Sequence, residues 1–69
     1  MRLPAGWQSS CGLPGSGDPI WVATSRHGRV RVLLYYQRGW ELRIIEGDRV
    51  EILRTVKLAR VRERLSHLR

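Results

Sequence analysis

The 69-residue sequence has one cysteine, one lysine and no phenylalanine. Cys11 has no partner in the chain, which excludes a disulfide framework. No run of about 18 apolar residues is present, which excludes a helix that spans a membrane. A chain of this length forms one domain at most, so an enzyme with a separate cofactor domain is also excluded. The first residues lack the apolar stretch of a signal peptide, and we therefore expect a cytoplasmic protein with a reduced thiol.

Acidic residues are scarce as well. Six Asp and Glu face 13 Lys and Arg, which gives a formal net charge of +7, and all the basic residues except Lys57 are arginine. A charge of this size on a small protein attracts polyanions. The guanidinium group also grips phosphate with two hydrogen bonds and stacks on bases. The composition therefore indicates nucleic acid, DNA or RNA, as the partner. A genome rich in G and C would also raise the arginine content without any such function.

The first 19 residues differ from the rest in composition. Glycine, proline and serine fill just over half of the stretch, which is typical of a flexible tail. Its glycines at positions 12, 15 and 17 match neither phosphate-loop pattern, so we expect no nucleotide cofactor. The sequence thus predicts a tail over 1–19 and a single small domain over 20–69.

From Ile20 onward, β-forming residues alternate between short turns. We expect strands over 20–24, 29–36 and 40–44, with turns at 25–28, 37–39 and 46–48. Trp40, Leu42 and Ile44 share one face and are expected to point inward. Val50 and Ile52 alternate with charged residues and indicate a fourth strand. Regular spacing with short turns predicts an antiparallel meander, either an open sheet or a partial barrel.

Near the end of the chain, the spacing of apolar residues changes from every second residue to a helical pattern. Apolar residues fall at helical steps of three and four, and basic residues repeat the same steps beside them. The apolar stripe is Leu58, Val61, Leu65 and Leu68. We predict an amphipathic helix over about 56–69, which makes the fold class α+β. A rival is a longer helix from Arg49, because Asp48 and Glu51 match a capping box. That helix would need burial on two sides, so strand followed by helix is favoured.

Two groups of basic residues are candidates for binding phosphate. Each phosphate contact releases counterions and the contributions add, so several cations must lie on one connected surface. On the outward face of the sheet the candidates are Arg29, Arg31, Arg43 and the possible stacking residue Tyr35; on the helix they are Lys57, Arg60 and Arg64. The alternation also places Glu41 and Glu51 on the outward face. Cross-strand pairs of Arg and Glu would explain these charges with no ligand.

An alternative function is protein binding. Several large apolar residues are predicted to face away from the core, and such a patch is typical of a contact surface. They are Trp21, Leu33, Tyr35, Ile45 and Leu53. This pattern would suit a small regulator or accessory subunit. It would also suit a homodimer, because a core of this size supplies only about 3–5 kcal/mol by itself.

The sequence does not indicate catalysis or a metal site. His27 and His67 lie far apart, and Cys11 has no histidine or cysteine at ligand spacing. The carboxylates between Glu41 and Glu51 surround a turn, where no cleft for acid–base chemistry is expected. We therefore predict a protein that is not an enzyme and holds no metal or cofactor.

The segment from Leu42 to Ile52 resembles a motif of known RNA-binding proteins. It reads L-R-I-I-E-G-D-R-V-E-I and is similar to the strand–turn–strand motif R-I-x-x-G-D-x-V-x-I of small OB-fold barrels such as bacterial translation initiation factor one. The resemblance implies a β-barrel fold and an RNA partner. It covers eleven residues, and the family's Ser-Gly-Lys helix region is absent here. The order of sheet then helix also resembles the three-stranded DNA-binding domains of some phage integrases.

Overall fold

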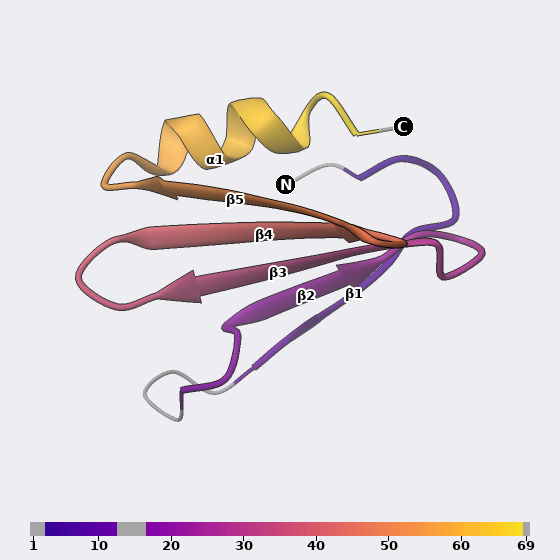
Figure 1. The fold of residues 1–69 in the computed structure, drawn as a ribbon, viewed down its shortest axis with the longest axis horizontal. Helices are drawn as coiled ribbons and strands as arrows, with labels where there is room; N and C mark the ends of the chain where they lie inside the picture. Colours follow the sequence, from indigo (N-terminus) through magenta and orange to yellow (C-terminus); the bar gives the residue numbers. More distant parts are fainter. Residues whose placement is uncertain (1–2, 13–16, 69) are drawn as a thin grey trace.

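A computed structural model describes residues 3–12 and 17–68 of the chain; residues 1–2, 13–16 and 69 lie outside the description. Five strands precede one helix (Figure 1). The elements are β1 (Gln8–Cys11), β2 (Trp21–Thr24), β3 (Val30–Tyr36), β4 (Trp40–Glu46), β5 (Arg49–Thr55) and α1 (Leu58–Leu65). The fold class is therefore α+β, as predicted.

The strands form one antiparallel sheet in the order β1-β2-β3-β4-β5. The prediction of four strands is wrong by one. The additional strand, β1, lies within residues 1–19 and pairs with β2, with Ser10 opposite Val22. Its sequence, Gln-Ser-Ser-Cys, carries no hydrophobic alternation, so no pattern in the sequence distinguishes it from a tail. Among the described strands the sheet is open, with β1 and β5 at its edges.

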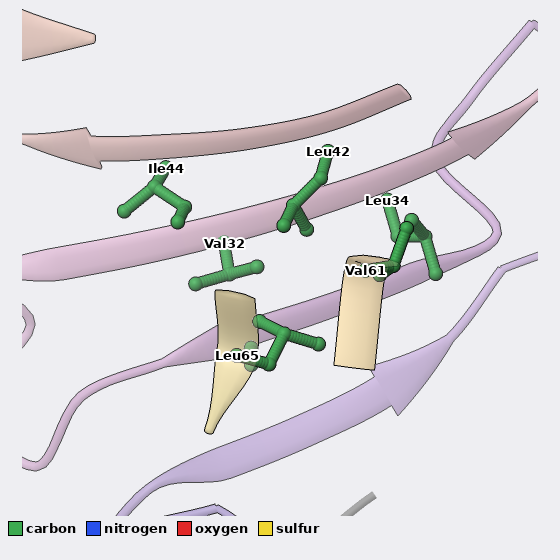
Figure 2. Packing of buried hydrophobic residues seen from close by; sticks show 7 residues of the cluster. Val32, Leu34, Leu42, Ile44, Val61 and Leu65 are labelled. Carbon is green, nitrogen blue, oxygen red and sulfur yellow. The ribbon is translucent and has the colours of Figure 1, made fainter. Parts of the chain in front are cut away.

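The core lies between one face of the sheet and α1 (Figure 2). Strand alternation directs every second side chain of β3 and β4 to this face, and the helical period directs two residues of α1 to meet them. The buried residues are Ala23, Val32, Leu34, Leu42, Ile44, Val61 and Leu65. The predicted inward positions of Leu42 and Ile44 are confirmed.

The C-terminal residues resolve the choice between the two predicted helices. Arg49–Thr55 is a strand and the helix begins only at Leu58, which confirms strand followed by helix. The Thr55 hydroxyl accepts a hydrogen bond from the backbone N–H of Lys57 at 3.1 Å, just before the first turn. Leu58 and Leu68 pack beside the buried Val61 and Leu65, as the apolar stripe predicted.

The turn between β4 and β5 decides which residues of β5 face the helix. Gly47 has a φ of 58°, and the two-residue loop pairs Glu46 with Arg49. A glycine with positive φ at the first central position is typical of a type II′ hairpin turn, which sets the register of the following strand. The register places Leu53 opposite the buried Leu42.

The cross-strand registers of β5 and β2 correct three predicted orientations. Leu53 packs against the core rather than outward, and Trp21 does the same from β2. Glu51, opposite Ile44, also belongs to the helix-covered face, whereas it was expected on the outward face. Alternation in sequence shows only which residues share a face. The turn and the cross-strand register decide which of the two faces meets the core.

Candidate nucleic-acid interface

The face of the sheet without the helix is open to solvent, and we call it the open face. Its membership follows from the registers, because residues opposite one another in a sheet share a face. Across β2 to β5 it consists of Val22, Thr24, Arg31, Leu33, Tyr35, Glu41, Arg43, Ile45, Val50, Ile52 and Arg54. Three arginines thus stand among aliphatic side chains and one tyrosine, against one carboxylate.

Glu41 joins two of these arginines. Its Oε2 lies 2.6 Å from Nη2 of Arg43, and its Oε1 lies 2.9 Å from Nε of Arg54. Hydrogen bonding from Arg43 is the main cause that lowers the pKa of Glu41; partial burial opposes it, and Arg54 lowers the pKa further. Arg54 was not among the predicted binding residues, although its position opposite Glu41 follows once β5 is registered. Two of the three positive charges on the open face are therefore partly balanced.

Arg43 also covers one side of the Tyr35 ring. Its guanidinium carbon lies 4.6 Å from the ring centroid, within the range of a cation–π contact. The predicted stacking residue and a predicted phosphate contact are therefore neighbours. A base could stack at this place only if Arg43 moved or if the base stacked on the guanidinium plane.

The predicted helix residues lie in the other layer of the molecule. Arg60 on α1 and Lys57 just before it are exposed, at the side of the sheet opposite the open face. Arg64 is engaged by Glu51, with Nε–Oε2 and Nη2–Oε1 distances of 2.5 and 2.8 Å. The structure therefore does not bring the two predicted groups of cations together on one surface.

A hollow of about 850 Å³ lies where the β2–β3 and β4–β5 turns meet the N-terminal segment. We call it the basic hollow. Its lining includes Trp7, Arg26, His27, Arg29, Arg31 and Glu46. Three arginines thus surround one opening, with Glu46 as the one carboxylate among its lining residues. Arg31 also belongs to the open face, so the two features are continuous.

Among the described residues, the three arginines of the basic hollow form no ion pair, in contrast to Arg43 and Arg54 of the open face and Arg64 of the helix. Ion pairs within the described residues involve Arg43, Arg54 and Arg64. In the same part of the chain, Arg26, Arg29 and Arg31 form none, and all three are exposed. The predicted binding residues include Arg29 and Arg31 but not Arg26. Its position in a turn between two strands, next to other arginines, was the available signal.

Local hydrogen bonds hold the turn that carries Arg26 and Arg29. The N–H of Gly28 donates to the carbonyl of Ser25 at 2.9 Å, and the N–H of Val30 donates to the Ser25 hydroxyl at 3.0 Å. Gly28 takes a φ of 73°, where a glycine is favoured. The turn therefore presents its arginines from a defined backbone.

The N-terminal segment closes the other side of the basic hollow. The Trp7 side chain packs partly against the core, and the backbone N–H of Trp7 donates to the carbonyl of Pro4 at 3.3 Å. Gly6 lies directly against the Arg26 side chain, because a Cβ at Gly6 would come within 2.9 Å of the Cβ of Arg26. The absence of a side chain at Gly6 thus allows Arg26 to lie across the segment. An aromatic ring and a cation are brought together from positions far apart in sequence.

The described residues contain no cluster of metal ligands. No group of three or more His, Cys, Asp or Glu side chains suited to a metal ion occurs in residues 3–12 and 17–68. The N-terminal glycines that were compared with a phosphate loop lie partly at 13–16, outside the described residues. Within the described part of the chain, no helix has the length and apolar character needed to cross a membrane.

No protein-family model, curated protein or solved structure matches this chain.

Proposed function

We propose that this protein binds nucleic acid through the basic hollow and the adjoining part of the open face. The observation that carries the proposal is a set of three arginines around one opening, Arg26, Arg29 and Arg31, which have no acidic partner among the residues that the structure describes. Free guanidinium groups on one connected surface are what phosphate binding requires, because each neutralised phosphate releases counterions.

The direction of the binding path follows from the position of Arg31. Arg31 faces Ile45 across the β3–β4 ladder, and Leu33 and Arg43 form the next pair on the open face. A nucleic-acid strand that enters at the β2–β3 turn can therefore pass from the basic hollow to Arg43 along neighbouring positions of the open face. The cations of α1 lie outside this path.

The surroundings favour a single strand over a duplex. Trp7 lines the basic hollow, and the open face offers Tyr35 with aliphatic neighbours. Single-stranded nucleic acids bind surfaces that combine cations for the backbone with aromatic or guanidinium planes for exposed bases. We therefore expect single-stranded RNA or DNA to bind more tightly than duplex of the same length.

The test compares two triple variants with the same change in charge. One replaces Arg26, Arg29 and Arg31 with Gln; the other replaces Lys57, Arg60 and Arg62 with Gln on the helix. Binding to labelled single strands and duplexes is measured by fluorescence anisotropy over a range of salt concentrations. The first variant should lose at least tenfold in affinity, with a salt slope shallower by about 2, or roughly 0.7 for each lost phosphate contact on a single strand.

The helix variant should retain most of the affinity and the slope of the wild type. Equal losses in both variants would show that only total charge matters and would contradict the assignment of the interface. No binding by the wild type at about 50 mM salt, where electrostatic attraction is strong, would refute nucleic-acid binding itself.

A further inference from the structure

We infer that a second copy of this chain pairs with the free edge of β5, in an antiparallel arrangement centred on Ile52. The observations that carry this are the direction of the backbone groups of β5, the symmetry of the strand about Ile52 and the exposure of its aliphatic side chains. The inference does not rest on the proposed function.

The backbone groups that point away from the sheet can be identified from the hydrogen bonds of Val30. The N–H of Ser25 donates to the carbonyl of Val30 at 2.9 Å, and the N–H of Val30 donates to the Ser25 hydroxyl at 3.0 Å, so the backbone groups of Val30 point toward β2. Bonded and non-bonded pairs alternate along an antiparallel ladder, and consecutive residues bond to opposite sides. Even-numbered residues of β3 therefore bond to β2, and odd-numbered residues bond to β4.

The same alternation continues to the edge of the sheet. Because odd-numbered residues of β4 bond to β3, its even-numbered residues bond to β5. Their partners in β5 are the odd-numbered Arg49, Glu51, Leu53 and Thr55. The pairing of Glu46 with Arg49 beside a two-residue turn gives the same result independently, since such a turn is closed by a bonded pair. The N–H and C=O groups of Val50, Ile52 and Arg54 therefore point to the free edge.

These groups have no other partner within the described residues. No hydrogen bond outside the regular elements of residues 3–12 and 17–68 involves the backbone of Val50, Ile52 or Arg54. α1 contacts β5 on the other face, where Glu51 pairs with Arg64 and Leu53 packs against the core. An edge strand with free backbone groups is a template for another strand.

β5 carries three charged residues, Arg49, Glu51 and Arg54, but it lacks three other features that protect an edge strand. Proline, lysine and bulges discourage pairing, and the seven residues Arg49–Thr55 contain no proline or lysine and pair with β4 without interruption. Val50 and Ile52 are 58% and 51% exposed, which places aliphatic surface beside the free backbone groups. By contrast, the other edge, β1, has only four residues, and none of them is a large aliphatic residue.

The strand is self-complementary about its midpoint. Ile52 is the central residue of Arg49–Thr55, and the outward-bonding residues at 50, 52 and 54 are symmetric about it. An antiparallel second copy would place Ile52 opposite Ile52, Val50 opposite Arg54, Glu51 opposite Leu53 and Arg49 opposite Thr55. No like charges would meet across the seam, whereas like charges directly opposite would destabilise it. Three bonded pairs would form, with two hydrogen bonds each.

The consequence is one continuous sheet with a two-fold axis. The two open faces would lie side by side, with Val50 and Ile52 of both copies forming an apolar stripe across the seam. A closed, isologous contact of this kind stops at the dimer. The net charge of +7 on each copy opposes association, so higher salt should strengthen the dimer, in contrast to binding of nucleic acid.

Sedimentation velocity tests whether the protein is a monomer or a dimer. It is run without nucleic acid over a range of protein and salt concentrations. The wild type should approach twice the chain mass of 8.0 kDa as its concentration rises. Ile52→Lys places two lysines opposite each other and should abolish the dimer. The matched control Val56→Lys changes a residue that is 79% exposed, lies just beyond β5 and adds the same charge; it should dimerise like the wild type.

Two further measurements identify the contact. An equimolar mixture of Ile52→Lys and Ile52→Glu should form a heterodimer, which also shows that both variants fold. Amide hydrogen exchange in the wild type should show protection at Val50, Ile52 and Arg54 that Ile52→Lys removes, whereas Glu51 and Leu53 stay protected in both. A wild type that remains monomeric, a dimer with fast exchange at these three amides, or growth beyond the dimer would overturn the inference.

Discussion

Arg64 of α1 holds both carboxylate oxygens of Glu51 on β5, at 2.5 and 2.8 Å. The pair joins the only described helix to the last strand of the sheet. It also explains why Arg64 is a weak candidate for phosphate binding, since its two-pronged donor set is already occupied. Arg64, which the sequence pattern predicted to contact phosphate, therefore attaches the helix to the sheet.

The Arg64–Glu51 pair predicts a pH-dependent part of the stability. Hydrogen bonding to Arg64 is the main cause that lowers the pKa of Glu51 below its ordinary value of 4.5, and burial opposes it. A depressed pKa gives stability that is present above the unfolded value and is lost as pH falls through the folded value. Both side chains are partly exposed, so the contribution is at most about 1 kcal/mol.

Urea unfolding at several pH values checks this expectation. Between about pH 6 and pH 3, the free energy of unfolding of the wild type should decrease more than that of Glu51→Gln. At the acidic end the two proteins should converge. Parallel curves for wild type and variant would show that the pair contributes nothing to stability.

We expect that replacing Arg38 with glycine stabilises the protein. It has a φ of 61°, the only positive φ among the non-glycine residues that the structure describes. This backbone region costs an L-residue energy that glycine does not incur. Arg38→Gly should raise the free energy of unfolding by about 0.5–1 kcal/mol, measured by urea denaturation. The neighbouring Gln37→Gly has no such strain to relieve and should not stabilise; equal effects would contradict the explanation.

We expect truncation of the buried Leu42 side chain to destabilise the protein strongly. Its side chain is fully buried, with 0% exposure, between the sheet and the helix. Leu42→Ala should cost about 2–5 kcal/mol, which is comparable to the whole stability expected for a domain of this size. The variant should therefore be largely unfolded by circular dichroism, whereas Val56→Ala at an exposed position should remain folded. A folded Leu42→Ala protein with an unchanged unfolding midpoint would show that the core lies elsewhere.

We expect that replacing Glu41 with glutamine makes the protein bind nucleic acid more tightly. Removing its charge releases Arg43 and Arg54, which both contact its carboxylate. In salt titrations, Glu41→Gln should steepen the slope of binding by roughly 0.7 for each arginine that gains a phosphate. Glu63→Gln makes the same change of charge on α1 and should alter the slope less. Weaker binding by Glu41→Gln would instead show that Glu41 positions the arginines for their ligand.

Much of the fold follows from local patterns in the sequence. Period-two alternation between glycine-containing turns indicated the four strands β2 to β5 and the inward side chains of Leu42 and Ile44. The steps of three and four after Val56 indicated the helix and its buried stripe. These features depend on residues close together in the chain, so their periodicity is visible without knowledge of the partner surface.

Strand β1 and the position of β5 do not follow from such patterns. Residues 8–11 have no apolar alternation and join the sheet because β2 offers them backbone partners. In β5 the apolar Val50 and Ile52 suggest an inward face, but the type II′ turn at Gly47 directs Leu53 and Glu51 to the helix instead. Cross-strand register therefore took precedence over side-chain hydrophobicity in this strand.

The candidate interface also has features that the local sequence predicts and features that only tertiary structure decides. The sequence by itself determined the excess of arginine and its concentration in two segments, because composition and spacing are local properties. Tertiary packing separated those segments onto opposite sides of the sheet and gave Glu41 and Glu51 as partners to three of the arginines. It also brought Gly6 and Trp7 against the turn that carries Arg26. Which charges remain free depends on these long-range contacts, since ion pairing requires proximity in space rather than in sequence.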